Sequence, residues 1–144
     1  MKHTTSSHYY VMFFIMIVSG FLTTMNVWAD SISDVRFSLN DLYMTLMMTG
    51  WMFMFMGLFY KEHNIFLIGI LLTITTFWCI RTQFMITEQQ YLLGMIPHHS
   101  MAVHMSKQLL EKENLNTNHK LKPFLENIVK TQSNEINFMK DKLV

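Results

Sequence analysis

The chain has 144 residues, of which 51% are hydrophobic and only 15% are charged, and its formal net charge is +1. A net charge this close to zero gives no reason to expect a nucleic-acid partner, and the length leaves room for one small water-soluble domain beside an apolar region. The single cysteine, Cys79, excludes a disulfide framework within one chain, and we expect it to be a small buried apolar side chain.

Three long stretches in the first part of the chain, 9–29, 42–60 and 64–80, carry no charged residue. A helix needs roughly 17 to 25 apolar residues to cross the hydrocarbon of a bilayer. The first two stretches meet that length, and the third meets it if Arg81 extends its charged end to the interface. The sequence therefore predicts membrane spans at about 9–29, 42–60 and 64–84, within a membrane region 1–86 whose partner is the lipid bilayer.

Charged residues beside these spans predict which side of the membrane each connection occupies. Lys2 precedes the first span and Lys61 lies in the short second connection, whereas the loop 30–41 carries three aspartates and one arginine. Basic residues favour the cytoplasmic side of a membrane. The sequence thus predicts a multi-pass protein of the bacterial inner (plasma) membrane, with its C-terminal segment on the periplasmic, extracytoplasmic side.

A second interpretation of the N-terminus stays open. Lys2, the apolar run 11–18 and the small residue Ala29 resemble a secretory signal peptide that is cleaved after Ala29. The apolar run is long for a signal peptide, which favours a retained first span. Both interpretations export the C-terminal segment, because two further spans follow in either case.

Methionine is in excess, with 15 residues in the chain, and six of them lie in the second predicted span: Met44, Met47, Met48, Met52, Met54 and Met56. They are either flexible apolar filler or a ladder of thioether ligands for Cu(I). No histidine, cysteine or carboxylate accompanies them in the span, which favours packing. Gly50 and Gly57, seven residues apart, indicate a close helix–helix contact.

Residues 87–144 are predicted to form a water-soluble helical hairpin, so that the fold class is all-α, with three transmembrane helices followed by this hairpin. Thr87 is the expected N-cap of its first helix. Apolar residues then repeat at threes and fours, and Pro97 should bend or restart the helix. We expect a loop over 114–118 and a second helix from about Lys122.

The residues that carry chemistry are concentrated at one turn of the first hairpin helix. His98 and His99 diverge by about 100° on a helix, so they serve neighbouring faces, while His104 projects elsewhere, toward solvent. If the hairpin closes, further candidate ligands and supporting groups from both helices surround this turn: Met95, Met101, Met105, Gln132, Glu135 and Met139. Imidazole, thioether and carboxylate together suit copper better than Mg or Ca.

Other interpretations of this turn are also open. A histidine on an apolar face is more often a hydrogen-bonded core residue, here with Glu135 as its partner. Ser100 and Ser106 have histidines nearby, but no oxyanion donors can be argued and there is no Gly-rich phosphate loop. A di-metal enzyme would need several glutamates. We therefore expect no catalytic residues.

Two segments of the hairpin resemble a known family. Residues 94–102 read Gly-Met-Ile-Pro-His-His-Ser-Met-Ala, and residues 132–139 read Gln-Ser-Asn-Glu-Ile-Asn-Phe-Met. They resemble domain of unknown function 305, whose hallmark is Met-Ile-Pro-His-His and a later Gln-x-x-Glu-Ile-x-x-Met. The order of short motifs between residues 37 and 83 is also similar to the membrane-anchored branch of that family.

This resemblance implies a ferritin-like domain, with relatives linked to copper binding and copper tolerance, and it implies these motif residues: Met95, His98, His99, Gln132, Glu135 and Met139. Because the chain has one hairpin, a complete four-helix bundle would need a second copy in a homo-oligomer, or packing onto the extension of the third span. We expect a membrane-anchored extracytoplasmic protein that binds Cu(I) or Ag(I), with Gln132 supporting the ligands. The alternative is a structural or interaction protein whose hairpin mediates oligomerisation or partner docking without a metal.

Overall fold

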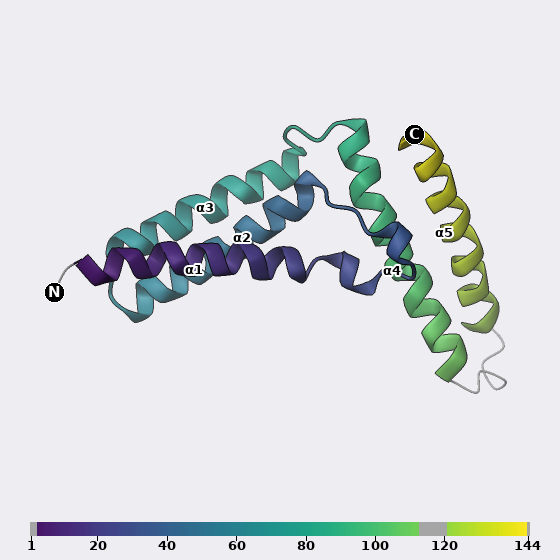
Figure 1. Ribbon diagram of the computed structural model, residues 1–144, viewed down its shortest axis with the longest axis horizontal. Coiled ribbons are helices and arrows are strands. Elements are labelled where there is room, and N and C mark those ends of the chain that lie inside the picture. Colours follow the sequence, from purple (N-terminus) through teal and green to yellow (C-terminus); the bar gives the residue numbers. More distant parts are fainter. Residues whose placement is uncertain (1–2, 113–120, 144) are drawn as a thin grey trace. The chain divides into compact units, whose positions relative to one another are not determined.

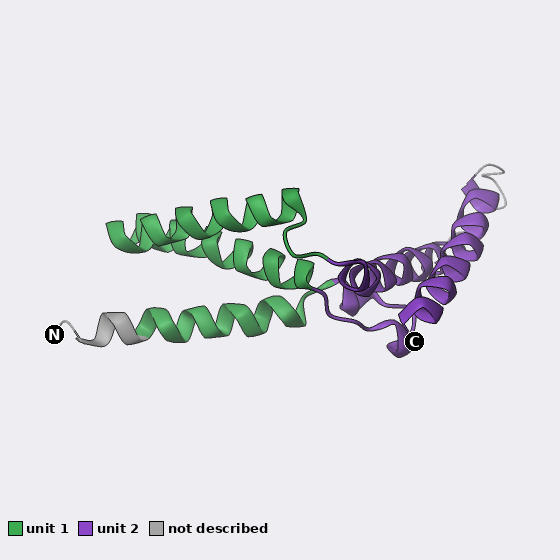
Figure 2. Cartoon of the chain, turned by 90° about the horizontal axis from the view of Figure 1, so that it is seen from above, with its two compact units in different colours: residues 1–24, 39–86 green, residues 25–38, 87–144 purple. Residues whose placement is uncertain are grey.

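The computed structural model describes residues 3–112 and 121–143. The regular secondary structure of this part of the chain is all helical, with five α-helices and two short 3-10 turns, and the predicted all-α class is confirmed for it. Lys2 and the loop expected over 114–118 lie outside the described residues. The chain divides into two compact units, coloured separately in Figure 2: an apolar unit of residues 1–24 and 39–86, and a hairpin unit of residues 25–38 and 87–144.

The apolar unit consists of the helices α1 (His3–Leu22), α2 (Leu39–Phe59) and α3 (His63–Thr82), labelled in Figure 1. Three stretches of the described chain are long and apolar enough to cross a membrane: His8–Trp28, Leu39–Phe59 and His63–Thr82. They overlap the three predicted spans. Cys79 is buried, as expected from its position in an apolar run.

The first helix ends earlier than the charge-free stretch suggested. α1 stops at Leu22, and residues Met25–Trp28 form a separate 3-10 turn, η1. The hydroxyl of Thr23 donates to the carbonyl oxygen of Ser19 (2.9 Å), and the Thr23 amide donates to that of Gly20 (3.2 Å). These bonds satisfy carbonyl groups that a helix end leaves without partners. An apolar composition therefore continues past the point where the backbone leaves the helix.

The contact between α2 and α3 depends on glycines that let the two backbones approach. A methyl group on Gly57 would lie 2.4 Å from the amide nitrogen of Phe66, and one on Gly69 would lie 2.5 Å from that of Met54. Gly50 is equally crowded, with the Thr73 hydroxyl 2.5 Å from the position of a Cβ. Small residues at such positions are typical of helix pairs in membranes. The close contact predicted from Gly50 and Gly57 is confirmed.

Substitution of Gly57 by alanine is expected to destabilise the apolar unit by about 1–3 kcal/mol, because the added methyl group must push the α3 backbone away. Thr75→Ala, at an exposed position of α3, is the matched control and should change little. The measurement is thermal unfolding of the full chain in mild detergent. Equal midpoints for the two variants would show that the helices do not need this close approach.

The hairpin unit contains α4 (Glu88–Lys112) and α5 (Leu121–Leu143), which run antiparallel to each other (Figure 1). Thr87 is confirmed as the N-cap, since its hydroxyl accepts a hydrogen bond from the Gln90 amide (3.3 Å). α4 continues through Pro97 without a restart. α5 begins within one residue of the expected position.

The core of the hairpin forms where the apolar stripes of α4 and α5 meet. Its buried residues, with the half-buried ones packed against them, recur at intervals of three, four and seven, as expected for facing helices. They are Ile96, Val103, Ile136 and Met139, surrounded by Leu92, Met95, Val129 and Leu143. The two histidines of the motif lie beside this core on α4.

The hairpin unit also includes residues 25–38, with the 3-10 turns η1 (Met25–Trp28) and η2 (Ile32–Asp34). In sequence this segment connects α1 to α2 and lies within the predicted membrane region 1–86. In space it packs against α4. The segment therefore brings side chains from the first third of the chain to the turn of α4 that carries His98 and His99, which we call the His-His turn.

Candidate metal site at His98 and His99

α4 directs the two adjacent histidines in different directions, as their sequence positions predict. The ring centroids of His98 and His99 are 6.0 Å apart, and the ring planes make an angle of 64°. His98 is exposed, whereas the side chain of His99 is only 14% exposed. Each imidazole therefore meets a different environment.

His99 faces α5. Its Nδ1 atom lies 2.9 Å from a carboxylate oxygen of Glu135, so this pair links the two helices of the hairpin. The same Nδ1 atom is buried and has no hydrogen bond of acceptable geometry. The two observations agree if the Nδ1–H bond points beside the oxygen, so that the two atoms are close but the angle is too bent for a regular hydrogen bond.

His98 faces the segment that follows α1. Its Nδ1 atom lies 3.3 Å from the sulfur of Met25 in η1. The two residues are 73 positions apart, and no local pattern in the sequence connects them. From the sequence, Met25 is only part of the first apolar stretch, so this contact is not predictable from it.

The other predicted ligands are distributed unevenly over the hairpin. Met95 and Met139 belong to the hydrophobic core, Met101 and Gln132 are half-buried, and Met105 is exposed. Among the described residues, no three His, Cys, Asp or Glu side chains converge on one point. The structure thus brings together two donor pairs, His98 with Met25 and His99 with Glu135, and leaves two predicted methionines in packing positions.

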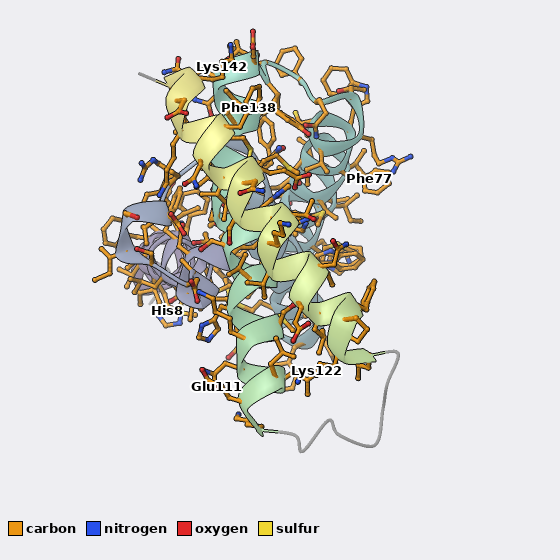
Figure 3. The ribbon with its side chains drawn as sticks, turned by 90° about the vertical axis from the view of Figure 1, so that its right-hand side faces the viewer. His8, Phe77, Glu111, Lys122, Phe138 and Lys142 are labelled. Atoms are coloured by element: carbon orange, nitrogen blue, oxygen red, sulfur yellow. The ribbon has the colours of Figure 1, made fainter. Side chains whose placement is uncertain are left out.

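The ends of the hairpin lie away from this region. Figure 3 shows Glu111 and Lys122 at one end of the helix pair and Phe138 and Lys142 toward the other. The Lys142 ammonium lies 5.6 Å from the centre of the Phe138 ring, a cation–π contact on the outer face of α5.

A buried polar cluster fixes the segment 25–38 to α4 at Ser100, two residues beyond His98. The Ser100 side chain is fully buried, and its hydroxyl donates to Asp34 (2.6 Å) while it accepts a hydrogen bond from the Asp30 amide (2.8 Å). Asp34, which is 5% exposed, also forms an ion pair with Lys140 of α5. Asp34 therefore contacts both helices of the hairpin.

The ionisation of Asp34 follows from these neighbours. Burial raises the pKa of its carboxyl group, but hydrogen bonds from Lys140, Ser100 and Ser33 and the positive charge of Lys140 outweigh burial. The pKa consequently lies below the ordinary value of 3.8. At neutral pH, Asp34 is a carboxylate that binds the segment to the hairpin.

Asp30 provides a second attachment. Its carboxylate accepts a hydrogen bond from the Lys107 ammonium (2.6 Å) and lies 3.9 Å from Nδ1 of His104. The expectation that His104 projects freely into solvent was wrong, because it is half-buried beside this aspartate. The acidic loop, in which the sequence indicates only a marker of topology, is also part of the hairpin unit through Asp30 and Asp34.

The thioethers of α2 are not part of this site. Met44 and Met48 lie exposed on α2, and the Thr73 hydroxyl approaches the Met54 sulfur at 3.8 Å within the α2–α3 contact. The Met54 contact is one of packing between neighbouring helices. For the α2 methionines as a group, packing stays the favoured interpretation and the thioether ladder for Cu(I) stays the alternative.

Comparison with known proteins adds the family. Residues 81–143 match the family model described as Domain of unknown function (DUF305). The chain is also 44% identical over 127 residues to "Uncharacterized protein L153" of Acanthamoeba polyphaga mimivirus, an alignment that covers 85% of this chain and 82% of the relative. Residues 81–143 therefore belong to the DUF305 family. No solved structure matches this DUF305 protein.

The family match does not cover residues 25–38, which pack against α4 and which we call the docked segment. The matched residues 81–143 include all of α4 and α5, with both histidines and Glu135. They do not include residues 25–38, which hold Met25 and Asp34. The longer alignment with the viral protein exceeds the hairpin unit and so extends into the apolar helices.

Proposed function

We propose that this DUF305 protein is a membrane-anchored, extracytoplasmic metal-binding protein that binds Cu(I) or Ag(I) at His98 and His99. The observation that carries the proposal is the approach of Glu135 to Nδ1 of His99 at 2.9 Å. A carboxylate beside one ring nitrogen favours the tautomer with its proton there and leaves the other nitrogen, Nε2, as a metal ligand. Metal-binding histidines are supported by carboxylates in this way.

The available donors fit a soft ion better than a hard one. His98 is exposed, with a thioether 3.3 Å from its ring nitrogen, and Glu135 is the one carboxylate in contact with either motif histidine among the described residues. Mg and Ca sites are built from several oxygen ligands, whereas thioether and imidazole donors suit Cu(I). A bound ion would give the hairpin a role in holding copper, as in copper tolerance, and no reaction is needed for it.

The order of the apolar stretches supports a single side for the hairpin unit. If each of the three crosses the membrane, residues 25–38 and 87–144 emerge on the same side, opposite Lys61. Packing of residues 25–38 against α4 requires the same arrangement. With Lys61 on the cytoplasmic side, the hairpin unit is extracytoplasmic, which is the periplasm in a bacterial cell with this protein in its inner membrane.

The test is an anaerobic titration of the full chain in mild detergent with Cu(I), in competition with a chromophoric Cu(I) chelator. Loss of a supporting group alone costs about 10- to 100-fold in metal affinity, so Glu135→Gln should bind Cu(I) more weakly than the wild type by a factor in that range. The double variant His98→Ala/His99→Ala should bind Cu(I) more weakly still. His8→Ala/His63→Ala, which changes two exposed histidines of the apolar unit, is the matched control. Unchanged affinity in the His98/His99 double variant would disprove the proposal.

A structural or interaction role is the second candidate, and two observations favour it. The His99–Glu135 pair links α4 to α5, and three aromatic side chains of the hairpin, Tyr91, Phe124 and Phe138, are exposed and available to a second copy of the chain. In this role the double histidine variant should unfold at a lower temperature in metal-free buffer. A metal-binding role instead predicts that the variant mainly loses the stabilisation that added Cu(I) gives to the wild type.

A further inference from the structure

The sulfur of Met25 lies beside His98 at a distance suited to a shared metal ion. The two atoms, Sδ and Nδ1, are 3.3 Å apart. With metal–nitrogen and metal–sulfur distances of about 2.0 and 2.3 Å, two ligands on neighbouring corners of a tetrahedral ion are separated by roughly 3.5 Å. An ion could therefore bind both donors after a shift of a few tenths of an ångström.

Met25 differs in accessibility from the methionines that the family motif contains. It is 42% exposed and its neighbour His98 is exposed, so an ion could reach both from solvent. Met95 and Met139, by contrast, lie in the hydrophobic core among apolar side chains. A thioether in contact with an imidazole and open to solvent is better placed to bind an ion than one that fills a core.

The backbone that carries Met25 is fixed by several hydrogen bonds. The Asn26 amide group donates to the Arg36 carbonyl oxygen (2.6 Å) and accepts from the Arg36 amide (3.0 Å), which closes the segment into a loop. The loop is held to α4 through Ser100, which binds both Asp30 and Asp34. Ser100 is two residues from His98, so one anchor positions both donors.

We infer that Met25 is a metal ligand that acts with His98, so that the site is formed by the segment after α1 together with the His-His turn of α4. This inference rests on the proposed Cu(I) binding and adds a ligand from outside the matched family region. A preorganised pair of donors loses little conformational freedom when the ion binds. One imidazole and one thioether are a soft pair, which suits Cu(I).

If Met25 is a metal ligand, the N-terminus is not cleaved as a signal peptide after Ala29. Cleavage after Ala29 would remove Met25 and leave the hairpin without this thioether. The metal-binding chain must therefore retain α1. Intact-mass measurement of the protein isolated from membranes should give a chain that includes Met25, and a mature chain beginning at Asp30 would overturn the inference.

The experiment compares Met25→Leu with Met85→Leu in the full chain in mild detergent, with Cu(I) alone as the probe. Met85 is an exposed methionine of the apolar unit and serves as the control. We expect Met25→Leu to lower Cu(I) affinity by about tenfold or more, and Met85→Leu to leave it unchanged. X-ray absorption at the copper edge should show a sulfur neighbour at about 2.3 Å that is lost only in Met25→Leu.

The outcomes separate this inference from the proposed function. If the His98/His99 double variant loses affinity but Met25→Leu keeps both affinity and the sulfur signal, Met25 is not a ligand and the proposed function stands. If neither variant changes affinity, both fail. Met25→Cys restores a soft donor and should recover affinity, whereas a loss caused only by disturbed packing would persist in that variant and would contradict the inference.

Discussion

Replacement of Asp34 by alanine is expected to destabilise the hairpin unit by about 3 kcal/mol, the largest loss we expect for any single substitution there. The carboxylate is 5% exposed and has two partners on different helices, Ser100 of α4 and Lys140 of α5. Removal of one member of a buried ion pair leaves the other without its partner, and a buried hydroxyl loses its acceptor. The loss falls at the lower end of the usual range because Lys140 is 27% exposed and can turn toward water.

Chemical or thermal unfolding of the full chain in mild detergent, followed by circular dichroism, measures this loss. Asp141→Ala removes an exposed carboxylate from α5 and is the control, for which a change within about 0.5 kcal/mol is expected. Equal stability of the two variants would show that the segment 25–38 does not depend on Asp34 for its attachment.

The Asp34 carboxylate also makes the stability of the hairpin unit depend on pH. The lowered pKa of Asp34 means that its folded-state carboxylate releases a proton more readily than the unfolded one. Its contribution to stability is therefore complete above the ordinary pKa of 3.8 and is lost as the pH falls through the lower, folded-state value. The stability difference between the wild type and Asp34→Asn should accordingly shrink in acid, whereas a constant difference would contradict this assignment.

Single cysteines at three exposed positions, introduced one at a time in a Cys79→Ser background, are expected to react with a membrane-impermeant maleimide either fully or not at all in intact cells. Cysteines at Ser31 and Asn134, both in the hairpin unit, should react in intact cells. A cysteine at Glu62, in the connection beside Lys61, should react only after permeabilisation. The reason is that residues 25–38 pack against α4, so both must lie on one side of the membrane.

Two other labelling patterns would be informative. Labelling of Ser31→Cys and Asn134→Cys from opposite sides would mean that the three apolar stretches do not all cross the bilayer, and it would separate the docked segment from the hairpin. Labelling of Glu62→Cys alone in intact cells would place the hairpin in the cytoplasm and contradict the extracytoplasmic function.

Much of the fold could be predicted because it depends on local patterns. Charge-free stretches of sufficient length predicted the apolar helices, since an apolar span excludes charged side chains. The N-cap Thr87 and the three-four spacing of apolar residues predicted α4, and Gly50 with Gly57 predicted the contact that α3 completes through Gly69. Each of these features is encoded within one or two helical turns.

The position of residues 25–38 could not be predicted in the same way. Its attachment depends on pairs such as Asp34 with Ser100 and Asp30 with Lys107, which are 66 and 77 residues apart. Neither pair has a periodicity or a motif that would reveal it. The end of α1 was missed for a different reason: hydropathy follows the side chains, whereas the Thr23 hydroxyl and a turn hydrogen bond end the helix.

The candidate site was predictable in part. His99 and Glu135 could be related because each has a defined position on one of two facing helices. Met95 and Met139 satisfied the same spacing but lie in the core, because the spacing of a ligand face and of a packing face is identical. Met25 reaches His98 through the docked segment, so its contact could be found only from the structure.

Metal analysis of the purified full-length chain, isolated in mild detergent from cells supplied with copper, tests whether this protein binds the metal at the His-His turn. We expect about one copper per chain in the wild type, because a soft imidazole–thioether site should retain Cu(I) during purification. We expect strongly reduced copper in His98→Ala/His99→Ala. Equal copper content in the two proteins, or none in the wild type, would contradict a metal-binding function for this hairpin.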